Sequence, residues 1–254
     1  MDLGLSGRIA VVTGGASGIG FAIAAQLVAE GVTVAIVDCN AQVLDEARQA
    51  LGPNAPIDTF LVDVSDRSAF AACLGGIVEK HGRLDVLVNN AGIANFSPLV
   101  EMSDDDWQAV FDTNLGAVRT STRVAVPLMR GQGGGAIVNV SSVVAERAQA
   151  GSSAYAASKA AIRQFTAVTA VEYGADNIRC NCVQLGPVLT KGTDQYRRDF
   201  PDRYALAAAA VPLKRWAQPQ EVAQVVAFLA SDRASFITGS SIPIDGGLAV
   251  AAAT

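Results

Sequence analysis

Short apolar runs recur along the chain and alternate with stretches of helical periodicity. The runs Arg8–Thr13 and Val32–Val37 are apolar almost throughout and rich in β-branched residues. Between them, Ile19, Ile23 and Leu27 repeat at intervals of four residues. Strands that are apolar throughout are buried on both faces, as in a parallel sheet, and the four-residue spacing is typical of an amphipathic helix. This first segment therefore predicts a strand, a helix and a second strand.

The same alternation continues to the end of the chain. Further strands are expected at Thr59–Val62, Leu84–Val88, Ala136–Val140, Ile178–Val183 and Ser241–Ile244. Further helices are expected at Ala41–Leu51, Arg67–Lys80, Asp104–Met129, Ser153–Tyr173 and Pro219–Ala230. Such alternation forms right-handed βαβ units, so it predicts an α/β fold with a doubly wound parallel sheet of seven strands and helices on both faces. No linker or repeat interrupts the pattern, so residues 1–254 are interpreted as a single domain.

Composition and charge exclude several classes of function. The 254 residues include 19 Lys and Arg against 24 Asp and Glu, a net charge of −5, and half of them are apolar. An acidic chain lacks the basic surface that binds nucleic acids, so no nucleic-acid partner is expected. The N-terminus has no signal-peptide pattern, and no apolar run reaches the roughly 18 residues that a membrane span needs. A cytoplasmic location without a membrane partner is therefore expected.

Cysteine and histidine are too few and too scattered to predict metal chemistry. The four cysteines contain no C-x-x-C pair, and Cys180 and Cys182 are expected to fill the core from one strand face. The single His81 lies at a predicted helix end, where histidine is more often a favourable cap than a base. No metal site is expected, and His-dependent hydrolysis is disfavoured.

A glycine cluster joins the first strand to the first helix. Its spacing is G-x-x-x-G-x-G, with glycines at positions 14, 18 and 20. Glycines allow a tight turn and close approach of a pyrophosphate to the backbone, and the helix N-terminus supplies N–H groups and a positive dipole. The cluster predicts the dinucleotide site of a Rossmann-type fold, formed by Gly14, Ser17, Gly18, Ile19 and Gly20.

The end of the second strand indicates which dinucleotide binds. Asp38 follows Gly20 by 18 residues, where a carboxylate can accept hydrogen bonds from the adenosine ribose and would repel a 2′-phosphate. No Lys or Arg stands at Gly15, Cys39 or Asn40 to hold such a phosphate. NAD is therefore favoured over NADP.

One predicted helix carries a candidate acid–base pair. Tyr155 and Lys159 are four residues apart, so they share a helix face. A nearby ammonium favours tyrosinate, so the pKa of the tyrosine is expected to fall and the side chain to act as a general acid and base. Ser142 lies thirteen residues before Tyr155, at the end of a predicted strand, where ligands bind in open parallel sheets.

In order and spacing, these motifs resemble those of the short-chain dehydrogenase/reductase family over essentially the whole chain. The resemblance also includes Asp63-Val64, Asn89-Asn90-Ala91-Gly92, Gly239 and Asp245-Gly246-Gly247. It implies a catalytic tetrad of Asn114, Ser142, Tyr155 and Lys159. It further implies cofactor contacts by Asp63, Val64, Asn90, Ala91, Gly92, Tyr155, Lys159, Val188 and Thr190.

One turn departs from the family's pattern. The family has Pro-Gly after the sixth strand, whereas this chain has Leu185-Gly186-Pro187. The missing proline is expected to loosen the turn while leaving Val188 and Thr190 in their cofactor-contacting positions.

The resemblance implies hydride transfer between C4 of nicotinamide and a carbinol or carbonyl carbon. Tyr155 would exchange the hydroxyl proton, Lys159 would stabilise tyrosinate and bind the nicotinamide ribose, and Ser142 would hold the substrate oxygen. Asn114 would hold a water that links Lys159 to solvent. Two alternatives stay open. One is an NADP-dependent 3-oxoacyl-thioester reductase, disfavoured by Asp38; the other is a non-enzymatic dinucleotide sensor, disfavoured by the complete tetrad.

The substrate and the assembly are predicted from one segment late in the chain, a set of candidate lining residues and two long helices. The segment Gly192–Trp216 is expected to form a lid over a small-molecule substrate. Other candidate lining residues are Ala94, Asn95, Phe96, Glu146, Arg147 and Gln149. Their polar groups suit a polyol, sugar or hydroxy acid, and a polyol or sugar alcohol is favoured. The long helices predicted at 104–129 and 153–173 carry more apolar residues than one sheet-facing stripe needs, which with the resemblance predicts a homotetramer.

Overall fold

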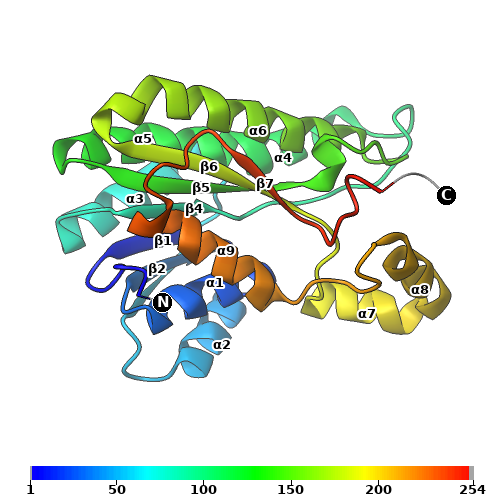
Figure 1. The fold of residues 1–254 in the computed structure, drawn as a ribbon, viewed down its shortest axis with the longest axis horizontal. Coiled ribbons are helices and arrows are strands. Elements are labelled where there is room, and N and C mark those ends of the chain that lie inside the picture. The colour runs from blue at the N-terminus through cyan, green and yellow to red at the C-terminus, as the bar shows by residue number, and fades with distance from the viewer. Residues whose placement is uncertain (1, 252–254) are drawn as a thin grey trace.

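The computed structural model describes residues 2–251 and confirms the α/β fold with its single sheet. All seven strands are parallel, in the order β3-β2-β1-β4-β5-β6-β7 (Figure 1). The strands are β1 (Ile9–Thr13), β2 (Thr33–Asp38), β3 (Ile57–Leu61), β4 (Val86–Asn89), β5 (Gly135–Ser142), β6 (Ile178–Leu185) and β7 (Ser241–Ile244). The α-helices are α1 (Gly18–Ala29), α2 (Ala41–Leu51), α3 (Arg67–His81), α4 (Asp104–Phe111), α5 (Ala117–Gly131), α6 (Ser153–Tyr173), α7 (Lys191–Asp199), α8 (Pro201–Ala210) and α9 (Pro219–Ala230).

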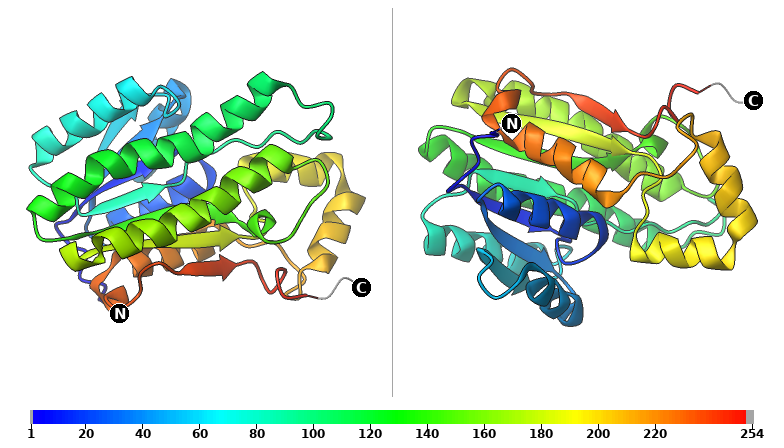
Figure 2. Two further views of the ribbon diagram at one scale, coloured as in Figure 1. Left: turned by 90° about the horizontal axis from the view of Figure 1, so that it is seen from above. Right: turned by 60° about the horizontal axis from the view of Figure 1, so that its bottom comes forward.

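Helices cover both faces of the sheet, which explains why its strands are apolar throughout. Figure 1 shows α1, α2 and α9 below the sheet and α4, α5 and α6 above it, and Figure 2 gives the same layers from two other sides. Successive residues of a strand point to opposite faces. Accordingly, Val12 of β1 packs in the core with Leu27 of α1, whereas Val11 packs with Phe70 of α3.

The chain reverses its direction across the sheet between β1 and β4. It runs outward from β1 through β2 to β3, and then returns to β4 on the other side of β1. Ligands of open α/β sheets bind at such a switch point, beyond the carboxyl ends of the strands. Here the two strand ends are tied together, because the Thr13 hydroxyl accepts the N–H groups of Asn90 and Ala91 at 3.0 and 3.1 Å.

The helix expected over 104–129 is divided. A π-helical turn at Asp112–Gly116 separates α4 from α5, and Asn114 lies within it. Such turns insert an extra residue into an α-helix and often occur at functional sites. Hydrophobic spacing does not resolve one extra residue, so the periodicity predicted a continuous helix.

The lid segment folds into two helices, α7 and α8, which stand beyond the carboxyl ends of the strands (Figures 1 and 2). Neither helix has a fully buried residue. The lid is anchored at its end, where Trp216 is buried and packs on Tyr204 of α8 with ring centroids 4.8 Å apart.

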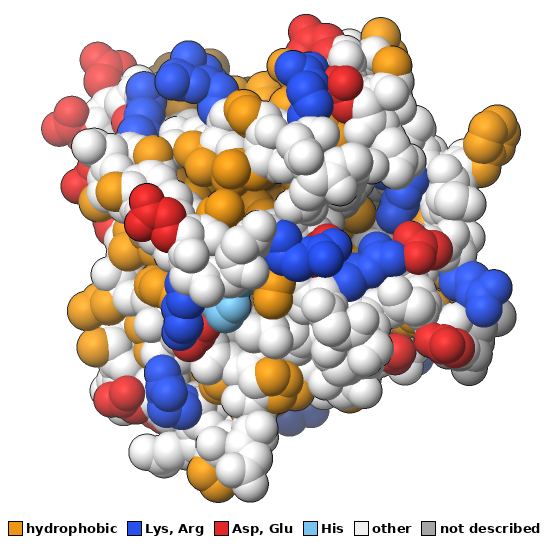
Figure 3. All heavy atoms as spheres, turned by 90° about the vertical axis from the view of Figure 1, so that its left-hand side faces the viewer, with side chains coloured by type: hydrophobic (Ala, Val, Ile, Leu, Met, Phe, Trp, Pro, Cys, Tyr) orange, Lys and Arg blue, Asp and Glu red, His pale blue; other side chains and the backbone are white. Residues whose placement is uncertain are grey.

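The opposite end of the molecule is formed by the amino ends of the strands. Figure 3 shows this face, where positive and negative side chains alternate. Arg8 pairs with Asp232, Arg83 with Asp85 and Lys80 with Asp58.

Candidate functional site

A cavity of about 1720 Å³ lies at the carboxyl ends of the strands and is lined in part by the lid. Three tetrad residues, Ser142, Tyr155 and Lys159, line it. All the residues predicted to bind the cofactor also line it: Gly14, Ser17, Gly18, Ile19, Gly20, Asp38, Asp63, Val64, Asn90, Ala91, Gly92, Tyr155, Lys159, Val188 and Thr190. The fourth tetrad residue, Asn114, is fully buried behind the cavity wall and does not line it.

The glycine loop forms a cradle that side chains would fill. A Cβ on Gly20 would lie 2.0 Å from the carbonyl oxygen of Gly14, and Gly14 and Gly18 have φ angles of +58° and +53°. The N-cap residue of α1, Ser17, makes no side-chain capping bond, and the residues of the first turn line the cavity, so their N–H groups are available to a ligand there. Exposed N–H groups at a helix N-terminus bind phosphate, so this loop fits a dinucleotide pyrophosphate.

A carboxylate borders the cavity at the end of β2. The Asp38 side chain accepts the Ala16 N–H at 3.3 Å through Oδ2 and the Asn40 N–H at 3.2 Å through Oδ1. Asp63 lines the same end of the cavity. Burial, and then the charges of Asp38 and Asp63, raise the pKa of the Cys39 thiol above its ordinary value. This end of the cavity is therefore electronegative.

Two side chains lie so close to the backbone of Gly92, after β4, that a larger residue would crowd them. A Cβ on Gly92 would lie 3.1 Å from Asn114 Oδ1 and 3.3 Å from Lys159 Nζ. The side chain of Asn114 fixes this segment, because it donates to the Ile93 carbonyl at 3.0 Å and accepts the Ile93 N–H at 2.8 Å. Its other amide hydrogen is donated to Ser158 Oγ at 3.0 Å. Asn114 thus joins the π-helical turn to the Gly92 segment and to α6.

Burial dominates the electrostatics of the acid–base pair, in which Lys159 is buried and Tyr155 is partly buried. Lys159 Nζ donates to the Val140 carbonyl at 2.9 Å, and burial lowers the pKa of Lys159 to about 8. Burial raises the pKa of Tyr155 above its ordinary value, and the Ser142 hydroxyl acts in the opposite direction. Lys159 Nζ lies 5.7 Å from the centroid of the Tyr155 ring. The expected lowering of the Tyr155 pKa by Lys159 is wrong for this structure, because burial is the dominant cause and raises this pKa.

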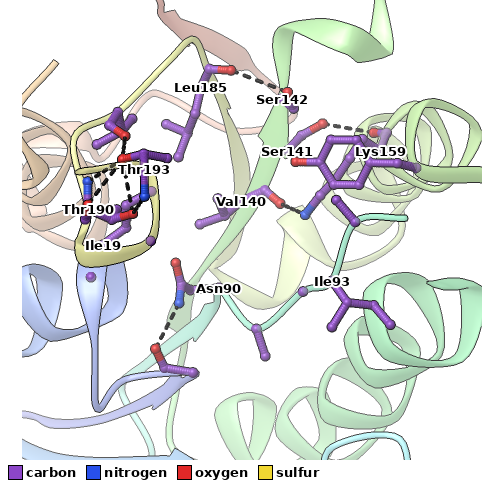
Figure 4. A pocket seen from close by; sticks show the side chains of 18 of the residues that line it. Ile19, Asn90, Ile93, Val140, Ser141, Ser142, Lys159, Leu185, Thr190 and Thr193 are labelled. Atoms are coloured by element: carbon purple, nitrogen blue, oxygen red, sulfur yellow. Dashed lines mark hydrogen bonds between the residues drawn. The ribbon is translucent and has the colours of Figure 1, made fainter. Parts of the chain in front are cut away.

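The two adjacent serines at the end of β5 differ in their hydrogen bonds. Ser141 Oγ donates to the Lys159 carbonyl at 2.8 Å and so fixes α6 on the sheet. Ser142 Oγ makes long contacts of 3.4 Å, to the Leu185 carbonyl (Figure 4) and from the Val144 N–H, and its hydroxyl also interacts with Tyr155. Its hydroxyl therefore keeps capacity for a further hydrogen bond at the cavity.

The turn after β6 is firmly held. Strand β6 continues through Leu185, Gly186 donates to the Ile244 carbonyl at 3.0 Å, and Ala217 donates to the Pro187 carbonyl at 3.0 Å. The expected loosening of this turn is not observed, because strand pairing replaces the constraint of the missing proline.

Thr193 positions Thr190 and was not among the predicted site residues. Thr193 forms a reciprocal capping box with Thr190, and its hydroxyl donates to the Val188 carbonyl at 2.9 Å (Figure 4). The T-x-x-T spacing is a capping signal that could have identified it. The box holds the start of α7 against the glycine loop, where Thr190 Cγ2 lies 3.3 Å from a Cβ built on Gly18.

The substrate end of the cavity is more apolar than expected. Of the polar candidates, Arg147 and Gln149 line the cavity, whereas Asn95 and Glu146 do not. Glu146 instead pairs with Arg163 at 2.6 Å. Other lining residues at this end are Ala94, Phe96, Val143, Ala148, Tyr196, Ala207, Ala210, Trp216 and Leu248. Trp216 and Leu248 carried no motif that would have singled them out.

Within residues 2–251, no three His, Cys, Asp or Glu side chains come together as metal ligands. In the same range, no helix is both long and apolar enough to cross a membrane.

Comparison with known proteins places the chain in one family. A family described as enoyl-(acyl carrier protein) reductase matches residues 14–249. The chain is 42% identical to 3-oxoacyl-(acyl-carrier-protein) reductase FabG of Thermotoga maritima, over 97% of this chain and 99% of that protein. It is 38% identical to cyclopentanol dehydrogenase of Comamonas testosteroni, over 94% and 96% of the two chains.

Solved structures of other proteins are also similar to this chain over nearly its whole length. L-sorbose reductase of Gluconobacter frateurii, solved with NADPH and L-sorbose, has a TM-score of 0.92 and 34% identity, with 98% of each chain covered. Levodione reductase has a TM-score of 0.91 and 34% identity, with 97% of this chain and 99% of that chain covered. The protein belongs to the short-chain dehydrogenase/reductase family, whose members bind a nicotinamide dinucleotide and act on CH–OH groups.

Proposed function

We propose that the protein is an NAD-dependent dehydrogenase/reductase that interconverts a secondary alcohol and a ketone with a largely apolar body. The observation that carries this proposal is the convergence of Ser142, Tyr155 and Lys159 on a cavity that also contains the glycine loop. A non-enzymatic sensor would not need an acid–base pair and a free hydroxyl at the same end of its dinucleotide site.

Each catalytic role follows from a contact in the site. A bound nicotinamide supplies or accepts the hydride. Ser142 Oγ holds the substrate oxygen and stabilises the charge that develops on it. Tyr155 gives or takes the hydroxyl proton. Lys159 Nζ lies over the Tyr155 ring, 5.7 Å from its centroid, where its charge can stabilise the tyrosinate. The Val140 carbonyl fixes the ammonium. Asn114 positions the Gly92 segment and α6, and the water predicted at Asn114 remains a proposal.

The pKa directions favour different chemistry at low and high pH. The raised pKa of Tyr155 keeps its hydroxyl protonated near neutral pH, which suits proton donation to a carbonyl oxygen. Ketone reduction should therefore run near neutral pH, and alcohol oxidation should increase as the pH rises toward the pKa of Tyr155.

The choice of NAD rests on the electronegative end of the cavity. Asp38 can accept ribose hydroxyls, and a 2′-phosphate would face the carboxylates of Asp38 and Asp63. Lys191, next to Thr190, also lines the cavity, and it is paired with Glu46 at 3.2 Å.

The proposal that the substrate has an apolar body is based on the side chains that line the cavity. A polyol needs a hydrogen-bond partner for each hydroxyl, because an unpaired polar group in a closed site is unfavourable. With Asn95 and Glu146 outside the cavity, few such partners remain. The geometry therefore supports an alicyclic or aliphatic ketone better than the polyol that the sequence favoured.

Initial rates with a panel of secondary alcohols and ketones test the proposal. Oxidation should be followed with NAD and with NADP, and reduction with the corresponding reduced nucleotides. We expect turnover of ketones with apolar bodies, with NAD preferred. Turnover of polyols alone would contradict the substrate class, and no turnover of any member would contradict the function.

A 3-oxoacyl-thioester reductase is the second candidate, supported by the 42% identity to the Thermotoga enzyme of that name. An acyl chain would also fit an apolar lining. A short 3-oxoacyl thioester distinguishes the two: if it is reduced with NADPH at a higher kcat/KM than any simple ketone with NADH, the second candidate is correct.

A homotetramer is the proposed assembly. On α6, Val168 and Val171 are 45% and 87% exposed, which is more apolar surface than a lone helix needs. Light scattering at micromolar concentration tests this, and a monomer would contradict it.

A further inference from the structure

The substrate end of the cavity contains a cation that has no acidic partner in the described part of the chain. Arg147 lies five residues after Ser142, and its partly buried side chain lines the cavity. None of the ion pairs formed by residues 2–251 involves its guanidinium. Its contact is a hydrogen bond from Nη1 to the Leu248 carbonyl at 2.9 Å. That bond fixes the guanidinium and leaves its other N–H groups for a ligand.

The carboxylates around Arg147 are bound to other groups. Asp245, three residues before Leu248, accepts the N–H groups of Gly247 and Ala249 at 2.9 and 2.7 Å and forms no ion pair with Arg147 within residues 2–251. The neighbour of Arg147 in the chain, Glu146, is paired with Arg163, outside the cavity. Asp38 lies at the end of β2, which is separated from β5 by β1 and β4. Three strand spacings of about 4.8 Å make this about 14 Å across the sheet. A cation that has lost part of its hydration without gaining an anion is unfavourable, so its retention in the cavity fits an anionic ligand.

We propose that Arg147 binds a carboxylate of the substrate, which makes the substrate a hydroxy acid or oxo acid with an apolar body. This inference rests on the proposed function, because it places the carbinol or carbonyl at Ser142 and Tyr155. A guanidinium presents parallel N–H groups that match a planar carboxylate. A single Arg provides one positive charge, which matches a monoanion better than a phosphate dianion.

The reaction leaves the carboxylate unchanged. In the oxidative direction, the carbinol C–H bond breaks and its electron pair leaves as hydride to C4 of the nicotinamide of NAD. The O–H proton passes to the deprotonated oxygen of Tyr155, and the carbon–oxygen bond becomes a carbonyl. The hydroxy acid is oxidised to the oxo acid and NAD is reduced to NADH.

Matched pairs of oxo acids and their methyl esters test the inference. The acids would carry the carbonyl at position 2, 3 or 4, and kcat/KM would be measured with NADH. For at least one position we expect the acid to exceed its ester by about tenfold or more, as a hydrogen-bonded ion pair provides. Arg147→Met should bring this ratio near one, and Arg147→Lys should give an intermediate ratio because an ammonium lacks the planar fork.

Arg130→Met is the matched control, because it removes the same charge from a residue outside the cavity whose partner, Asp176, also lies outside it. It should keep the wild-type ratio. A second measurement on the wild type does not depend on folding of a variant: a saturated carboxylic acid should inhibit ester reduction at a concentration about tenfold below that of its amide.

The outcomes separate this inference from the proposed function. Ester turnover with a ratio near one at every position, or a ratio that survives in Arg147→Met, would overturn the role of Arg147 alone. Equal inhibition by the acid and the amide would overturn it as well. If neither acids nor esters are reduced with either nucleotide, the proposed function itself is overturned.

Discussion

The same strands form both ends of the sheet, but the polar groups at the two ends differ in whether they have partners within the protein. At the amino ends, Asp85 accepts the Ile9 N–H at 2.8 Å and is bound by two nitrogens of Arg83. Arg8 and Asp232 form a further ion pair at this end of the molecule. Each of these groups finds its partner within the protein.

At the carboxyl ends, several polar groups lack such partners. The N–H groups of the first turn of α1 have no side-chain cap, and the contacts of Ser142 Oγ with the backbone are 3.4 Å long. Buried polar groups are normally hydrogen-bonded, so groups left open at one end of a sheet mark the place where ligands complete them. Changes at the carboxyl end should therefore affect turnover, whereas changes at the amino end should affect stability.

The largest expected effect is the loss of the proton donor at the carboxyl end. Tyr155→Phe keeps the ring, which packs 6.1 Å from Phe96, and removes the hydroxyl. General acid–base catalysis contributes about 10²–10⁴-fold, so kcat should fall at least 100-fold while NADH still binds. Initial rates and NADH fluorescence titration measure the two effects.

Tyr173→Phe is the control for this variant. Tyr173 lies at the end of the same helix, away from the cavity, and its ring stacks under Arg130. It should keep its turnover. A Tyr155→Phe variant with wild-type rates would show that another group moves the proton.

The second prediction concerns the stability cost of the catalytic cation. Burial lowers the pKa of Lys159 from 10.5 to about 8, so the charged form is less favourable in the folded than in the unfolded protein. This destabilisation is fully present below pH 8 and disappears as the pH rises from 8 to 10.5. Lys159→Met should therefore raise the free energy of unfolding at pH 7, by on the order of 3 kcal/mol at most, while removing turnover.

Denaturant unfolding at several pH values checks the sign. The gain in Lys159→Met should shrink between pH 8 and 10.5. Lys214→Met is a matched control, because Lys214 Nζ also donates to a backbone carbonyl, that of Ala209 at 2.7 Å, but is exposed. A pH-independent difference between wild type and Lys159→Met would contradict the argument.

The third prediction tests the amino end. In Asp85→Ala, the buried Ile9 N–H loses its side-chain acceptor and Arg83 loses its partner. The free energy of unfolding should fall by about 2 kcal/mol, with kcat/KM retained. Asp176→Ala breaks an ion pair with Arg130 near the surface and should cost less than about 1 kcal/mol. Equal losses in the two variants would show that burial of Asp85 does not matter.

The sequence predicted the fold well because the sheet is buried on both faces. Continuous apolar strands and regular helices follow from that burial, and the glycine loop needs glycines for space that the structure confirms at Gly20. Strand ends and helix spacing placed Tyr155, Lys159 and the Ser141-Ser142 pair near the ligand edge of the sheet, and the family resemblance singled out Ser142, Tyr155 and Lys159, all of which line the cavity.

What the sequence did not predict depends on contacts between distant segments. The π-helical turn at Asn114 and the diversion of Glu146 to Arg163 leave no periodic signal. The pKa of Tyr155 was predicted in the wrong direction, because spacing reveals the neighbouring charge but not the depth of burial.

The smallest expected effect concerns the choice of dinucleotide at Asp38. Its carboxylate already accepts the N–H groups of Ala16 and Asn40, so it is held at the cavity with lone pairs remaining for ribose hydroxyls. Hydrogen bonds to a charged group contribute about 1.5–3 kcal/mol, so wild-type enzyme should prefer NAD over NADP by about tenfold or more.

Asp38→Ala should weaken NAD binding and reduce the preference for NAD, without producing tight NADP binding, because no cation is added. Adding Cys39→Arg should then favour NADP, since a guanidinium pairs with the phosphate. Asp45→Ala removes an exposed carboxylate of α2 outside the cavity and should keep the wild-type preference in initial-rate assays. Equal use of both nucleotides by the wild type would mean that Asp38 does not contact the ribose.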